Sequence, residues 1–147
     1  MPKVPLPLAV PHTKILFIVC NTYTTEKYKL VVDQFIDSLT VTVNHKKMGY
    51  TVFYLHNAAS PNFREWLKGI LNNAQSDLTV FYAGHGCSIP DHNGYESGGM
   101  DKAMLFDDSY AREDDLARYL RQHRNANQRT ILLNDCCHSS SIWAPRS

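Results

Sequence analysis

Four short apolar runs, each ending at a polar residue or a glycine, alternate along the chain with segments of helical spacing. The runs span residues 14–20, 51–56, 78–83 and 129–135. The first of them is a continuous apolar run, which is typical of a strand buried on both faces and placed centrally in a parallel sheet. Strands that alternate with helices are joined by right-handed crossovers. The pattern therefore predicts a three-layer α/β sandwich, with a mostly parallel sheet of about four strands flanked by helices.

Between the runs, apolar residues recur at steps of three and four, which is the spacing of one helix face. This spacing predicts helices over about 25–47, from Ser60 onward and from Asp114 onward. Ser60 precedes a proline, and a hydroxyl followed by proline is a helix-start signal. The polar, glycine-bearing stretch over about 87–100 predicts a long loop, of a length that is more often functional than connective.

The composition indicates one globular domain. With 147 residues, 44% of them hydrophobic, the chain has enough material for one core and too little for two typical domains. We assign residues 1–13 to a proline-rich arm and residues 14–147 to the domain. Lys and Arg total 15 and Asp and Glu 14, so no charge excess points to nucleic acid.

Neither a membrane span nor a signal peptide is indicated, because the arm lacks a continuous apolar core and no later run is long enough. The cysteines lie within or beside strand-like runs, which suggests reduced thiols rather than a disulfide framework. They occupy positions 20, 87, 136 and 137. We therefore expect a cytoplasmic protein that binds neither nucleic acid nor membranes.

Two of the strand-like runs end at residues suited to covalent catalysis. His85 follows one run between two glycines, and Cys137 lies just beyond another. In sheets of this kind ligands bind outside the carboxyl ends of the strands, where both residues fall. A Cys and a His in contact can form a thiolate–imidazolium pair, in which the thiolate attacks a carbonyl and the imidazole transfers protons. Glycines beside His85 allow a sharp turn and close approach of a substrate, and the Gly86 N–H is a candidate oxyanion donor.

Strand alternation separates the two adjacent cysteines. If the last run stays extended, residues 135 and 137 point to one face and residue 136 to the other. Asp135 then lies roughly 7 Å from Cys137 along the strand, where its carboxylate can receive a basic side chain of the substrate. Cys136 is then a small buried hydrophobe, and the strand pattern alone leaves the same role open for Cys137.

Three carboxylates near or after the long loop are candidate ligands for a hard cation such as calcium, although the chemistry of a Cys–His pair itself requires no cofactor. They belong to Asp101, Asp114 and Asp115. The alternative for Asp114 and Asp115 is the first turn of a helix, where carboxylates accept N–H groups and favour the helix dipole.

Three segments, in this order, resemble metacaspases. They are Tyr-Ala-Gly-His-Gly at 82–86, Gly-Met-Asp-Lys-Ala-Met at 99–104 with the later Asp-Asp-Leu at 114–116, and Asp-Cys-Cys-His-Ser at 135–139. The resemblance implies a caspase-like sandwich and a cysteine endopeptidase that cuts after Arg or Lys. It also implies that Cys137 is the nucleophile, His85 the general acid/base and Asp135 part of the pocket for the basic side chain.

A complete caspase-like domain has a further small region with two more strands, whereas ten residues follow Cys137. We therefore expect the large-subunit region only, with residues 129–135 at an open sheet edge that favours association. The leading hypothesis is a Cys–His endopeptidase acting on proteins or peptides with basic residues. The alternative is a catalytically silent or incomplete caspase-like module that binds or regulates a full-length relative. A nucleotide-binding domain is not supported, because no phosphate-binding glycine motif follows any run.

Overall fold

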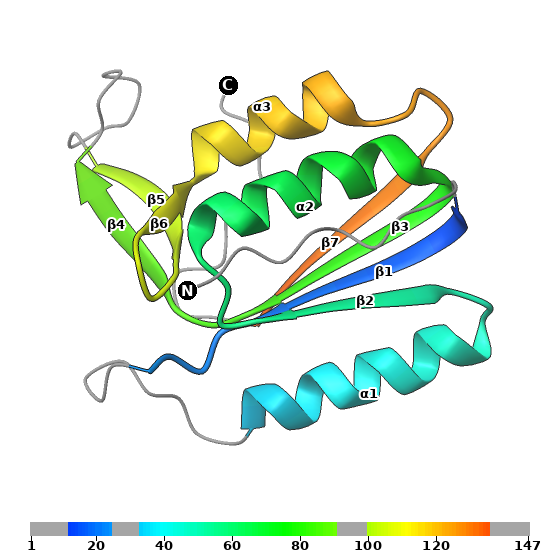
Figure 1. Ribbon diagram of the computed structural model, residues 1–147, viewed down its shortest axis with the longest axis horizontal. Helices are drawn as coiled ribbons and strands as arrows, with labels where there is room; N and C mark the ends of the chain where they lie inside the picture. Colours follow the sequence, from blue (N-terminus) through cyan, green and yellow to red (C-terminus); the bar gives the residue numbers. More distant parts are fainter. Residues whose placement is uncertain (1–11, 25–32, 91–99, 136–147) are drawn as a thin grey trace.

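The main sheet is parallel and holds the four predicted strands. The computed structural model describes residues 12–24, 33–90 and 100–135. The sheet has the order β2-β1-β3-β7, and each pair of neighbours is parallel (Figure 1). Its strands are β1 (His12–Cys20), β2 (Thr51–His56), β3 (Ala74–Ala83) and β7 (Arg129–Asp135). The predicted parallel sheet is confirmed, with β1 and β3 beginning a few residues earlier than expected.

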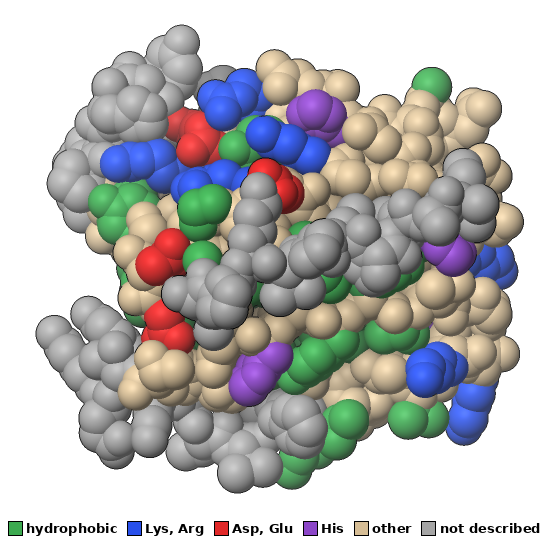
Figure 2. All heavy atoms as spheres, in the orientation of Figure 1, with side chains coloured by type: hydrophobic (Ala, Val, Ile, Leu, Met, Phe, Trp, Pro, Cys, Tyr) green, Lys and Arg blue, Asp and Glu red, His purple; other side chains and the backbone are tan. Residues whose placement is uncertain are grey.

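Helices cover both faces of this sheet. The helix α1 (Asp33–Lys47) lies on one face, and α2 (Ser60–Asn73) and α3 (Glu113–His123) lie together on the other (Figure 1). The three-layer prediction is therefore confirmed. No helix within the described ranges is both long and apolar enough to cross a membrane. Over α3, Figure 2 shows basic side chains mixed with acidic ones, so this part of the surface has no field of a single sign.

The central strand β1 forms the middle of the core. Its residues from Ile15 to Cys20 are all fully buried. Ile15, Phe17 and Val19 pack in the cluster that includes α2 and α3, whereas Leu16, Ile18 and Cys20 pack in the smaller cluster on the α1 side. Burying an apolar side chain of this size contributes about 1.5–3 kcal/mol, so a strand that is apolar on both faces is held between two helical layers.

The helix boundaries agree with the local sequence signals where the structure describes them. Residues 25–32 of the predicted first helix lie outside the described residues, and α1 continues to Lys47 through its β-branched stretch. There the Thr42 hydroxyl donates to the carbonyl of Ser38 at 2.8 Å. α2 begins at Ser60 as predicted, and the N–H of Ser60 donates to Asp108 Oδ1 at 2.9 Å. A carboxylate from another segment therefore caps this helix.

A second, antiparallel sheet follows β3. It has the order β4-β5-β6 and comprises β4 (Gly86–Pro90), β5 (Met100–Leu105) and β6 (Tyr110–Arg112). The prediction of a loop from Cys87 is therefore wrong for its first residues, which form β4, and residues 91–99 lie outside the described residues. Met104 and Ala111 join the core cluster of α2 and α3, which attaches the small sheet to the main domain.

The strand β7 lies at one edge of the main sheet. Among the described strands it pairs with β3 alone. On its α1 side, Ile131 and Leu133 are 46% and 38% exposed, because α1 packs against β1, β2 and β3. β7 therefore presents both an unpaired backbone edge and apolar side chains within the described part of the chain.

Candidate active site

The last residues of the three strands β1, β3 and β7 are aligned with one another. Ala83 of β3 is aligned with Cys20 of β1 and with Asp135 of β7. The hydrogen bonding continues one step further, since the N–H of Asn21 donates to Ala83 O at 2.8 Å and that of Gly84 to Asp135 O at 3.4 Å. Cys20, Ala83 and Asp135 therefore lie side by side at one edge of the sheet, and His85 follows at this edge.

His85 is held at this edge by both polar groups of its backbone. Its N–H donates to Tyr23 Oη at 2.6 Å. Its carbonyl accepts from Tyr82 Oη at 2.7 Å and from the N–H of Leu105 at 3.0 Å. The half-buried imidazole stacks on the Tyr23 ring, with ring centroids 5.0 Å apart and planes inclined by 25°. Contacts from three chain segments therefore fix the position of this histidine.

A glycine is needed at position 84 because a larger side chain has no room there, not because of the backbone conformation. Its φ lies outside the left-handed region, and a Cβ at this position would lie 2.6 Å from Tyr82 Oη and 2.8 Å from Tyr23 Oη. Real Cβ atoms do not approach other atoms so closely. The glycine before His85 therefore makes room for the two hydroxyls that bind the histidine backbone, a reason that the sequence did not reveal.

Gly86, the candidate oxyanion donor, begins β4 and is paired with Met104 of β5. The N–H of Leu105 donates to the carbonyl of His85, so Gly86 and Met104 form a non-hydrogen-bonded pair of the antiparallel ladder. The N–H of Gly86 therefore points away from β5.

Asp135 ends β7 on the face covered by α1. It is aligned with Ala83 and Cys20, which pack in the cluster on that side. Burial raises the pKa of the Cys20 thiol, and the charge of the Asp135 carboxylate adds a smaller increase. Hydrogen bonds with Tyr54 and Ser38 oppose this rise in pKa. The half-buried carboxylate therefore lies close enough to the end of β1 to act on a group there.

The predicted nucleophile Cys137 and its neighbour Cys136 lie outside the described residues, so the predicted dyad stays a prediction. Asp114 and Asp115 stand in the first turn of α3, as the alternative to metal binding proposed, and Asp115 pairs with Arg118 at 3.2 Å. Asp101 lies in β5. Within the described ranges no group of three or more His, Cys, Asp or Glu side chains is arranged to hold a metal ion, and calcium binding stays a prediction.

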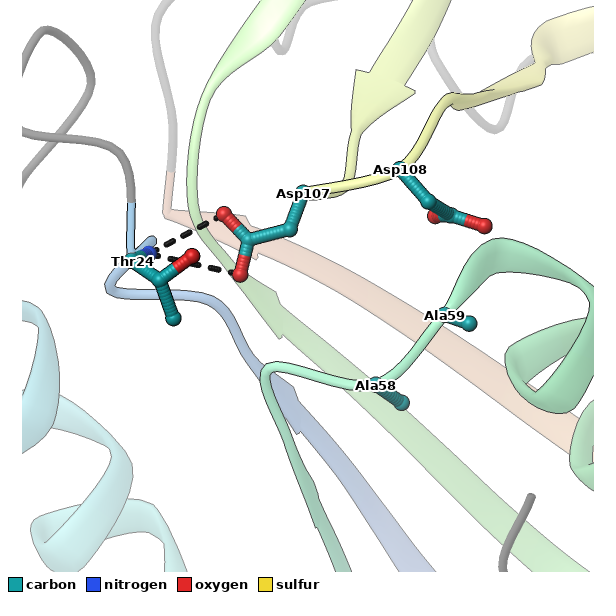
Figure 3. A pocket seen from close by; sticks show the side chains of 5 residues that line it. All are labelled: Thr24, Ala58, Ala59, Asp107 and Asp108. Carbon is teal, nitrogen blue, oxygen red and sulfur yellow. Dashed lines mark hydrogen bonds between the residues drawn. The ribbon is translucent and has the colours of Figure 1, made fainter. Parts of the chain in front are cut away.

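A pocket of about 560 Å³ lies beside this edge and was not foreseen from the sequence (Figure 3). Thr24, Ala58, Ala59, Asp107 and Asp108 line it. The Asp107 carboxylate accepts the N–H of Thr24 at 3.0 and 3.3 Å, while Asp108 points toward the start of α2. Both carboxylates thus bind backbone N–H groups of neighbouring segments.

A three-layer sandwich with a histidine fixed at the end of its third parallel strand is the arrangement of a caspase-like domain. The model of the caspase domain family matches residues 13–145, and the chain belongs to this family. It is 31% identical over 100 residues to metacaspase-1 of Plasmodium falciparum (isolate 3D7), a match that covers 59% of this chain and 16% of the relative. The resemblance to metacaspases in the sequence is thereby confirmed.

Two solved structures share the fold. Protein GSU0716 from Geobacter sulfurreducens superposes with a TM-score of 0.74 at 20% identity, over 89% of this chain and 53% of that one. Caspase-1 from Spodoptera frugiperda superposes with a TM-score of 0.64 at 15% identity, over 92% and 54%. The chain thus spans about half the length of these structures and a smaller share of the metacaspase.

Proposed function

We propose that this domain is the catalytic part of a cysteine endopeptidase in which Cys137 and His85 form the dyad. The observation that carries the proposal is the register of β3 and β7. Ala83 is aligned with Asp135, and His85 and Cys137 each follow that aligned pair by two residues. Neighbouring strands lie about 4.8 Å apart, and two residues of chain extend about 7 Å at most. This register supports the proposed dyad, because the chain brings the thiol within reach of the imidazole when both segments continue in the direction of their strands.

The proposed chemistry is acyl transfer through a thioester. The Cys137 thiolate attacks the carbonyl carbon, and the oxyanion that forms accepts the N–H of Gly86. His85 gives its proton to the amine nitrogen as the C–N bond breaks. It then takes a proton from a water molecule whose oxygen attacks the thioester, and the C–S bond breaks to return the thiolate.

The proposed specificity is for Arg or Lys before the cleaved bond. Its support is the position of Asp135, which ends β7 two residues before the nucleophile with its carboxylate half-buried. A carboxylate in this position binds a guanidinium or ammonium group through charge-assisted hydrogen bonds. A cytoplasmic location is also proposed, because a reducing compartment keeps thiols free, and Cys20 and Cys87 carry free thiols.

The test is cleavage of fluorogenic peptides that end in Arg, Lys or Asp, measured with and without calcium. We expect turnover of the basic reporters, loss of turnover in Cys137→Ala and in His85→Ala, and retention in the matched variant Cys136→Ala. Activity that survives Cys137→Ala would overturn the assignment of the nucleophile.

We also propose that the chain associates with another chain through the outer edge of β7. The support is the exposure of Ile131 and Leu133 beside a backbone edge with no partner among the described strands. Complex formation without any thiol-dependent turnover would instead favour the silent, regulatory module.

A further inference from the structure

Tyr23 contacts His85 through both its hydroxyl and its ring. The hydroxyl accepts the His85 N–H at 2.6 Å and donates to Leu105 O at 2.9 Å. Because its own proton is directed to Leu105, the oxygen presents a lone pair to the histidine N–H. The hydrogen bond to the N–H of His85 fixes the position of the histidine backbone relative to the end of β3. The hydrogen bond to Leu105 O links the same hydroxyl to β5.

The ring of Tyr23 restrains the imidazole. The two rings stack with centroids 5.0 Å apart and planes inclined by 25°. Rotation about the second side-chain torsion of a histidine is broad in the absence of contacts. A stacked neighbour narrows it to orientations that keep the two planes close to parallel, which limits where the ring nitrogens point.

Tyr23 itself is held in an unfavourable backbone conformation by a side chain from another segment. Its φ is 67°, in the left-handed region that bulky residues avoid. Asn57 Oδ1 accepts the N–H of Thr22 at 2.8 Å and that of Tyr23 at 3.0 Å. Asn57 follows β2 and has a left-handed φ of 49°, which asparagine tolerates better than most residues. Strained backbone that a specific contact maintains is a recurrent feature of functional sites.

We propose that Tyr23 is a positioning residue for His85, fixing both the backbone and the ring of the imidazole partner of the dyad, with Asn57 holding Tyr23 in place. The proposal rests on the proposed function, since it concerns the same dyad. Tyr23 is 3% exposed, and a buried tyrosine can serve packing alone. Its hydroxyl, however, binds the histidine backbone directly, and Gly84 leaves the space that this hydroxyl occupies.

The test compares Tyr23→Phe, which keeps the ring and removes the hydroxyl, with Tyr23→Leu, which removes both. The matched control is Tyr50→Phe, since Tyr50 packs on the ring of His45 at 4.7 Å, before the start of β2. For each variant, kcat and KM are measured on an arginine reporter. Hydrogen exchange of the His85 amide and the chemical shifts of its ring protons are measured by NMR.

We expect Tyr23→Phe to lower kcat about 3- to 10-fold with KM unchanged, the effect of one neutral hydrogen bond, and to speed exchange of the His85 amide. Tyr23→Leu should lower kcat about 100-fold and shift the ring protons of His85, because the stacked ring is lost as well. Tyr50→Phe should leave every readout unchanged. Asn57→Ala keeps the rings of Tyr23 and His85 and should also lower kcat with KM unchanged. This variant provides the test if the Tyr23 variants do not fold.

If the wild type is active, two results would overturn the positioning role and leave the proposed function standing. One is an unchanged kcat in both Tyr23→Phe and Asn57→Ala, and the other is a change in KM with no change in kcat. An inactive wild type would refute the proposed function and, with it, any catalytic role of Tyr23. In that case, comparing the exchange rate of the His85 amide in the wild type and in Tyr23→Phe shows whether the hydrogen bond to Tyr23 exists without a catalytic role.

Discussion

Replacing Gly84 by alanine tests how closely the two tyrosine hydroxyls approach the backbone before His85. The added Cβ would lie 2.6 Å from Tyr82 Oη and 2.8 Å from Tyr23 Oη. Neither hydroxyl has room to withdraw, because Tyr82 is fully buried and Tyr23 is 3% exposed. Overpacking costs about 1–3 kcal/mol, and displacing both hydroxyls from His85 costs about 1 kcal/mol for each hydrogen bond. We therefore expect the free energy of unfolding to fall by about 3–5 kcal/mol.

Urea denaturation followed by far-UV circular dichroism measures this change. The matched control is Gly49→Ala, since Gly49 has a left-handed φ of 85° and open space around its Cβ position. That variant should cost about 1–2 kcal/mol, from backbone conformation alone. In a Tyr23→Phe background Gly84→Ala should cost less, because one of the two clashing hydroxyls is gone. A cost in the wild type no larger than that of Gly49→Ala would refute the steric argument.

Three further predictions concern the carboxylate at the end of β7, the outer edge of β7 and the buried thiol of Cys20. Asp135→Asn should lower kcat/KM for arginine and lysine reporters about 10- to 100-fold, the value of a charge-assisted hydrogen bond, while an equal loss on neutral reporters would contradict a role in specificity. Leu133→Lys should abolish any concentration-dependent association seen by light scattering, whereas Ile36→Lys on the exposed side of α1 should not; equal effects would argue against the β7 edge. The folded state raises the pKa of Cys20 above the usual 9.0, so the stability it contributes is complete below pH 9.0 and is lost as pH rises through the folded value. Cys20→Ala should flatten this alkaline loss in urea denaturation, and an unchanged slope would show that another group titrates.

The main sheet was predictable because its signal is local. Every residue from Ile15 to Cys20 is apolar and fully buried, so the strand and its central place follow from one short run. α2 was equally clear, with a start signal at Ser60 and an apolar face on one side. The strand order was not predicted from the sequence; it places Asp135, at the end of β7, beside the end of β3, and His85 follows two residues later.

The remainder depends on contacts between distant segments. β4 is short, and its pairing with β5 crosses the undescribed residues 91–99, so no local pattern announces it. Tyr23 stands among polar residues after β1, and its role arises only where Asn57 and His85 meet it. Sequence reasoning justified Gly84 by freedom of the backbone, whereas the structure justifies it by the volume of two side chains from elsewhere.

The carbonyl of Leu105 has a consequence for the small sheet. It accepts from Asn21 Nδ2 at 3.1 Å and from Tyr23 Oη at 2.9 Å, while the N–H of the same residue donates to the carbonyl of His85. A slip of β5 by one residue would move this carbonyl about 3.4 Å and leave both donors without it. The register of β5 in the small sheet therefore sets the position of the imidazole relative to the main sheet. Changes in the length or pairing of β4, β5 and β6 would alter the alignment of the candidate active site without replacing any residue of that site.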